Sequence, residues 1–203
     1  MKQKSEFSKG AIEAMAKGIE PVYKYYFQGN NKTLIKASDY YVPWFFGKKQ
    51  RLEEFETHYT PMSMAAFLCA VKHKTTEMFG EPNETLIELL KKKHLPARSY
   101  KEFNEYWEAI QKADEEQENK DPKELVKQIT VIFLNKIFGP QTQYPNPDYI
   151  ESDRLRMALG FQIGNHMYSM NFGVTKVFER LAQEGRIPPA RPGYKYSRPV
   201  EKK

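Results

Sequence analysis

The sequence predicts an all-α protein of seven or eight helices that ends in an extended C-terminal arm. Apolar residues recur at spacings of three and four along most of the chain, which places them on one face of a helix. Glycine and proline stand where such segments would start or stop, and the alternation typical of strands is nearly absent. We therefore expect one irregular multi-helix domain over residues 1–185 and an arm rich in proline, arginine and tyrosine over residues 186–203.

The first predicted helix carries apolar side chains from Ile12 to Tyr26 at one-face spacing. Pro21 lacks a backbone donor and is expected to kink this helix or to restart it. Glycine and asparagine at residues 29–31 indicate a turn. A short helix is then expected over residues 33–41, because Pro43 would end it.

The most apolar helix is predicted over Met62–Phe79. Thr60 is a capping residue followed by proline at the first helical position, and Gly80 suits a left-handed residue at the end. Residues Met64–Val71 are apolar throughout. We therefore expect this helix at the centre of the core.

Three helices are predicted in the middle of the chain, from Asn83 to His94, from Ser99, and from Pro122. Ser99 and Glu102 have the spacing of a capping box. Residues 114–121 form an acidic run, which favours a solvated linker over an acidic binding site.

The last two helices are predicted over residues 152–170 and 174–184, with Gly185 as the stop. Gly160 and Gly164 lie one turn apart in the first of them, and each lowers helix stability by about 1 kcal/mol relative to alanine. Close approach of another helix is expected to compensate, and contact with a neighbouring subunit is the alternative.

The positive charge of the chain is concentrated in the arm. Residues 186–203 hold six of the 32 basic side chains and one of the 26 acidic ones, so the remainder is nearly balanced. The longest apolar run has eight residues, so no simple transmembrane helix is expected, and the N-terminus lacks the apolar core of a secretory signal. The single cysteine, Cys69, favours a reduced intracellular location, with cytoplasm and mitochondria not distinguished.

No motif for catalysis, a cofactor or a metal is found in the sequence: it holds no glycine-rich phosphate loop, paired cysteines, His-Glu-x-x-His or nucleophile elbow. Cys69 and His73 lie one helical turn apart, but a cysteine in an apolar run is far more often a packed core residue than a nucleophile. We expect a non-enzyme without a cofactor. An unrecognised all-α enzyme is the alternative, which a polar pocket holding His73 or His166 beside a carboxylate would support.

Aromatic residues are concentrated near the N-terminus, where residues 22–46 hold nine of the chain's 28. One helix face cannot bury the rings of VYKYYF, so some are expected on the surface. Core packing, a protein partner, base stacking and a membrane surface compete as explanations, and a protein partner is the functional reading we adopt. The candidate partner-binding residues here are Tyr25, Tyr26, Tyr41, Trp44, Phe45 and Phe46.

Prolines exclude a helix from the arm, and its few apolar residues are too little to offset the entropy of ordering it alone. It is therefore expected either to be held by a neighbour or to be a flexible tail. The candidate partner-binding residues in the arm are Arg191, Tyr194, Tyr196 and Arg198.

These features favour a non-catalytic accessory or structural subunit of a large intracellular assembly, such as a mitochondrial membrane complex, a ribosome or a virion. The aromatic region and the arm would be its two adhesion surfaces. A nucleic-acid-binding protein, in which the arm contacts phosphates and tyrosines stack on bases, is the alternative from another class. The nearly balanced charge of residues 1–185 argues against it.

Overall fold

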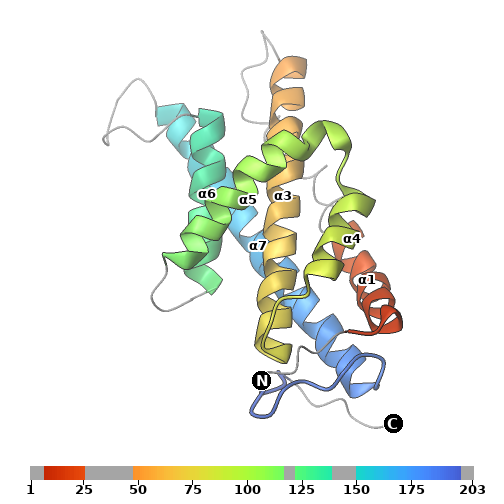
Figure 1. The fold of residues 1–203 in the computed structure, drawn as a ribbon. Helices are drawn as coiled ribbons and strands as arrows, with labels where there is room; N and C mark the ends of the chain where they lie inside the picture. The colour runs from red at the N-terminus through yellow and green to blue at the C-terminus, as the bar shows by residue number, and fades with distance from the viewer. Residues whose placement is uncertain (1–6, 26–47, 117–121, 139–149, 198–203) are drawn as a thin grey trace.

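A computed structural model describes residues 7–25, 48–116, 122–138 and 150–197, and within these residues the protein is helical, without strands. This confirms the predicted all-α fold class. The helices, labelled as in Figure 1, are α1 (Lys9–Tyr23), α3 (Lys48–Phe79), α4 (Glu84–His94), α5 (Tyr100–Glu115), α6 (Pro122–Phe138) and α7 (Ile150–Gln183), with a 3-10 turn at Ala97–Ser99.

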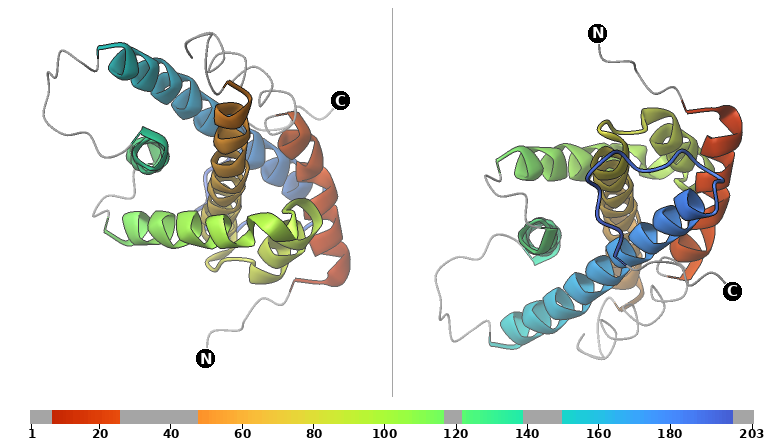
Figure 2. Two further views of the ribbon diagram at one scale, coloured as in Figure 1. Left: turned by 90° about the horizontal axis from the view of Figure 1, so that it is seen from above. Right: turned by 90° about the horizontal axis from the view of Figure 1, so that it is seen from below.

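Helix α3 is the centre of the arrangement. It packs against α4, α5, α6 and α7, while α1 packs against α4 and α7. Figure 2 shows α3 foreshortened in the middle of the bundle, with α7 crossing it obliquely. Two long helices therefore cross at the core, and the shorter helices cover the remaining sides.

The core forms where the apolar run of α3 meets its neighbours. Phe67, Leu68 and Val71 are fully buried, which confirms the prediction that this helix is central. Phe103 of α5 and Phe133 of α6 are also fully buried. Full burial of one large apolar side chain stabilises the fold by about 1.5–3 kcal/mol, so this cluster dominates its stability.

Several predicted helix ends are confirmed. Asn83 precedes α4, and its side chain accepts a hydrogen bond from the Leu86 amide over 3.0 Å. Gly80 and Gly185 follow α3 and α7 with φ of 92° and 69°, the left-handed conformation in which glycine carries no steric penalty. Helix α6 begins at Pro122, as its sequence predicts.

Two predicted helix boundaries are wrong for the same reason. Helix α3 begins at Lys48 and continues through Pro61, and α7 is a single helix through Gly173, where two helices were expected. Proline and glycine each weaken a helix interior. Buried residues flank both positions, Tyr59 and Met62 in α3 and Met170 and Val174 in α7, so packing holds each helix continuous.

Pro21 likewise lies inside α1, which ends two residues later at Tyr23. The capping box at Ser99 is also wrong, because the Ser99 side chain makes no capping hydrogen bond and the 3-10 turn leads directly into α5. Asp114 and Glu115, assigned to the acidic linker, belong to α5. The short helix predicted over residues 33–41 lies outside the described residues.

No helix among the described residues is both long enough and apolar enough to cross a membrane.

Candidate protein-interaction surfaces

Helix α7 exposes a row of three aromatic side chains, which we call the α7 stripe: Phe161, Tyr168 and Phe172. Their exposed fractions are 73%, 52% and 48%. Spacings of seven and four residues place all three on one face of the helix. The opposite face, with Ile163 and Met167, is buried against the rest of the protein. The stripe is therefore a surface that this chain leaves uncovered at the described residues.

A cation lies at one end of the α7 stripe. The Nζ atom of Lys176 is 4.4 Å from the centroid of the Phe172 ring, within the range of a cation–π contact. Asn165, on the same face, is exposed. The stripe thus combines three apolar rings with one positive charge, a composition typical of the core and rim of a protein interface.

The α7 stripe was not predicted from the sequence. Ile163, Met167 and Met170 share one face of this helix by their spacing, and all three are buried. The sequence does contain a signal for the stripe, because Phe161, Tyr168 and Phe172 form a second set of large apolar residues on the face opposite the buried one. A helix that buries one face and carries aromatic residues on the other should have been marked as a candidate interface.

The N-terminal aromatic region is described only at its edge. Tyr25 is 66% exposed just beyond the end of α1. The other candidates of this region, Tyr26, Tyr41, Trp44, Phe45 and Phe46, lie outside the described residues.

The C-terminal arm packs against its own body, an arrangement that the sequence analysis did not consider. Ile187 is buried, and the Arg191 amide donates a hydrogen bond over 2.7 Å to the carbonyl oxygen of Met78 at the end of α3. Gly193, at φ 86°, turns the chain so that Tyr194 points back toward α7. Arg198 lies outside the described residues.

A buried carboxylate on α7 holds the far part of the arm. The Tyr194 hydroxyl donates to Glu179 Oε1 over 2.6 Å, the Ser197 amide donates to the same oxygen over 3.1 Å, and the Ser197 hydroxyl donates to Oε2. Lys74 of α3, also buried, has its Nζ 3.9 Å from Glu179 Oε1 and 4.8 Å from the Tyr194 ring centroid. Tyr194 therefore already has partners in this chain, whereas Arg191 and Tyr196 remain exposed.

The charge state of this cluster follows from its surroundings. Burial alone would raise the pKa of Glu179, but the hydrogen bonds from Ser197 and Tyr194 and the charge of Lys74 outweigh it and hold the pKa below its usual value. Burial and the bond to Glu179 raise the pKa of the Tyr194 hydroxyl. Glu179 is therefore a carboxylate and Tyr194 a neutral donor near neutral pH.

The two predicted packing glycines both face α6. A Cβ added to Gly160 would lie 3.2 Å from Leu134 Cδ1, and one added to Gly164 would lie 4.0 Å from Val126 Cγ1. Gly18 of α1 is packed more tightly than either, because a Cβ there would lie 2.9 Å from Leu181 Cδ1.

His73 does lie beside a carboxylate, the arrangement named above as support for an enzyme. Its Nε2 is 2.8 Å from Asp114 Oδ2. However, the cavity that His73 lines together with Cys69 and Met167 has a volume of only about 30 Å³, room for only a few water molecules. Burial, and then the charge of Asp114, raise the pKa of the Cys69 thiol to about 12, opposite to the shift that activates a nucleophile. This site therefore lacks both the room for a substrate and an activated thiol.

The described residues also hold no group of three or more histidine, cysteine, aspartate or glutamate side chains placed to bind a metal ion. Comparisons with protein-family models, curated proteins and solved structures find no match to this chain. Any functional conclusion therefore depends on the surfaces described above.

Proposed function

We propose that this protein is a non-catalytic subunit of a larger intracellular protein assembly, and that it binds a neighbouring subunit through the α7 stripe. The observation that carries the proposal is the alignment of Phe161, Tyr168 and Phe172 on the outer face of a helix whose inner face is buried. Phenylalanine and tyrosine are enriched at the cores of protein interfaces, and tyrosine is among the residues that dominate binding energy there.

The rigidity of α7 supports this proposal. The helix packs against α1, α3 and α6 over much of its length, so its outer face is held in place before a partner arrives. A surface that is already ordered loses little conformational entropy on binding. The expected partner presents an apolar surface to the rings and a carboxylate to Lys176.

The arm and the N-terminal aromatic region are proposed as additional contacts. Exposed Arg191, Lys195 and Tyr196 remain available for a partner while Tyr194 holds the arm on the body. Tyr25 is exposed at the start of the N-terminal aromatic region.

The test is crosslinking mass spectrometry of the protein purified gently from its native source, with and without nuclease. We expect crosslinks from Lys176 to one protein neighbour that nuclease does not remove. The double variant Tyr168→Ser/Phe172→Ser should lose this neighbour, because truncating one central interface aromatic costs about 2 kcal/mol or more.

Tyr25→Ser is the matched control, since it removes an exposed aromatic ring outside the stripe and should retain the Lys176 crosslink. Loss of the neighbour in Tyr25→Ser but not in the double variant would assign binding to the N-terminal aromatic region and contradict the stripe. Loss of all neighbours after nuclease treatment would favour the nucleic-acid alternative.

A further inference from the structure

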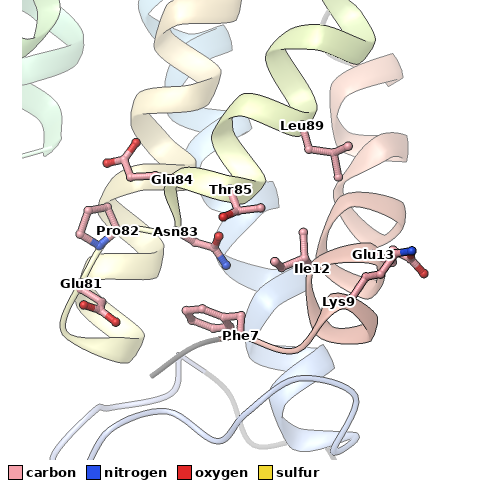
Figure 3. A pocket seen from close by; sticks show the side chains of 10 residues that line it. All are labelled: Phe7, Lys9, Ile12, Glu13, Glu81, Pro82, Asn83, Glu84, Thr85 and Leu89. Carbon is pink, nitrogen blue, oxygen red and sulfur yellow. The ribbon is translucent and has the colours of Figure 1, made fainter. Parts of the chain in front are cut away.

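A hollow of about 830 Å³ lies on the surface between the N-terminal part of α1 and the start of α4. Figure 3 shows Phe7 and Ile12 facing it from the α1 side, and Thr85 and Leu89 facing it from α4. The volume falls within the range of about 300–1,000 Å³ that ligand sites occupy. We call this hollow the α1–α4 groove.

A buried polar side chain at the groove, Asn83, has one donor group without a partner among the described residues. Asn83 is only 4% exposed, and two hydrogen bonds fix its orientation. Its side-chain Oδ1 accepts from the Leu86 backbone amide at the start of α4, and its backbone amide donates to Thr75 Oγ1 over 3.1 Å. The Nδ2 group is left with no hydrogen-bond partner among the described residues. In Figure 3 this amide lies between Phe7 and Ile12, on the groove side of the α4 start.

An unpartnered buried donor is destabilising, and a ligand with a hydrogen-bond acceptor would satisfy it. The nitrogen has almost no accessible surface, so the acceptor reaches it only when a lining side chain turns aside. Phe7 can supply this movement because it precedes α1 and is not held by helical hydrogen bonds. Its ring rests on Phe79 at a centroid distance of 4.9 Å, which favours the covered state when no ligand is bound.

The charged side chains at the rim of the groove determine which charge of ligand is favoured. Among the described residues that line the groove, Glu13, Glu81 and Glu84 are acidic and Lys9 is basic. Glu13 and Glu84 are exposed, and the contact of Glu13 with Lys9 is long, at 4.0 Å, between two highly exposed side chains. A net negative rim disfavours anionic ligands and attracts cations.

We propose that the α1–α4 groove binds a basic peptide segment of a partner protein, with one apolar side chain between lysine or arginine residues. The apolar side chain would pack among Phe7, Ile12 and Leu89. The flanking cations would pair with the exposed carboxylates of Glu13 and Glu84. A backbone carbonyl of the peptide would accept the hydrogen bond from Asn83 Nδ2. A peptide supplies all three groups at the spacing of adjacent residues, which is how grooves of this kind recognise extended segments.

The test is fluorescence anisotropy with the full chain and a labelled peptide, Ac-Lys-Arg-Leu-Lys-Arg-amide. We expect saturable binding that weakens as salt is added, because exposed charge pairs are screened. Replacing the peptide leucine by serine, or its cations by glutamate, should abolish binding. Binding of the leucine and serine peptides with equal affinity would overturn the proposal, since charge alone would then account for it.

Matched variants locate the site. Glu13→Gln/Glu84→Gln should weaken binding about fivefold, since each exposed pair contributes a fraction of a kcal/mol. Glu108→Gln/Glu115→Gln, which removes two exposed glutamates of α5, should leave binding unchanged. Asn83→Ser keeps a capping oxygen but removes the Nδ2 donor, and it should also weaken binding. If the two glutamate double variants lose the same amount of peptide affinity, the peptide does not bind in the groove.

Two further outcomes are distinguished by the same assay. If the peptide binds only after removal of residues 198–203, the basic end of this chain is the occupant and a separate partner is ruled out. Tyr168→Ser/Phe172→Ser should bind the peptide normally, so failure of the α7 stripe and failure of the groove are separate results.

Discussion

At the scale of single residues, Glu179 is the side chain that joins the arm to the body. One carboxylate receives the Tyr194 hydroxyl and both donors of Ser197, and it faces the buried ammonium of Lys74. Hydrogen bonds to a charged acceptor contribute about 1.5–3 kcal/mol each, more than neutral ones. The arm is therefore held mainly by this polar cluster and by Ile187.

Glu179→Gln should release the arm beyond residue 191. The variant replaces a charged acceptor of three hydrogen bonds by a neutral amide, while Lys74 keeps its ion pair with Glu77 at 3.0 Å. We therefore expect a loss of about 1.5–3 kcal/mol. Hydrogen exchange measured by mass spectrometry should show faster exchange in the arm while the core of α3 stays protected. Glu184→Gln, an exposed glutamate in the same helix region paired only on the surface, is the control and should change stability by less than about 1 kcal/mol.

The same cluster sets a pH dependence. Because the folded pKa of Glu179 is lowered, the stability it contributes is present above its unfolded value of about 4.5 and is lost as pH falls through the folded value. Arm protection should thus be constant near neutral pH and disappear only in acid. If the protection of the arm, relative to the exchange rate of an unfolded chain, already falls at pH 6, then Glu179 does not control the release of the arm.

The cluster shows what the sequence could not reveal at this scale. The sequence predicts Tyr194 as an anchor for another protein, whereas its hydroxyl bonds to Glu179 of the same chain. Glu179 lies in an ordinary helical pattern beside Arg180, and no spacing rule connects it to Ser197 across the Gly185 and Gly193 turns. Such contacts depend on the path of an irregular segment, which composition does not specify.

At the scale of helices, three glycines test how closely the elements approach. In α1, Gly18 packs against Leu181 of α7, while Gly160 and Gly164 of α7 face α6. The spaces beside them differ, since an added Cβ would meet its nearest side-chain atom at 2.9 Å, 3.2 Å and 4.0 Å respectively. Alanine gains the same helix propensity over glycine at all three sites. The room for its Cβ therefore decides whether each variant is more or less stable than the natural protein.

Gly164→Ala should stabilise the protein by about 0.5–1 kcal/mol, because alanine favours the helix and 4.0 Å is an ordinary van der Waals contact. Gly18→Ala should destabilise it by about 1 kcal/mol, since overpacking against buried Leu181 costs more than the helix gains. Thermal unfolding of the two variants and of Gly160→Ala should place the last between them. Stabilisation by Gly18→Ala would show that α1 and α7 separate more easily than the structure indicates.

Helix identity was largely predictable from sequence, and helix continuity was not. The Asn83 cap located the start of α4, and Gly80 and Gly185 located the C-terminal ends of α3 and α7, because these signals act on the local backbone. Pro61 and Gly173 each weaken a helix interior locally, so the sequence favours a boundary at both. Continuity through them depends on packing against other helices, and a local pattern contains no information on that packing.

At the scale of the whole molecule, Cys69 lies where three helices meet. The small cavity beside it is lined by residues of α3, α6 and α7. Helix α6 packs on α5, α7 and α3, so moving it away would uncover Cys69 without disturbing α1 or α4. The reactivity of this one thiol therefore reports whether α6 belongs to the same cooperative unit as the rest of the protein.

We expect Cys69 to react with iodoacetamide only through global unfolding. Its side chain is buried and its pKa is raised to about 12, so the reactive thiolate is scarce in the folded state. The labelling rate should rise with urea with the same slope as the free energy of unfolding measured by circular dichroism. Cys69→Ala/Thr76→Cys, which moves the thiol to an exposed position on the same helix, should react at once without urea. Labelling of Cys69 that is fast and nearly independent of urea would mean that α6 opens separately, and the helices around α3 would then form two cooperative units instead of one.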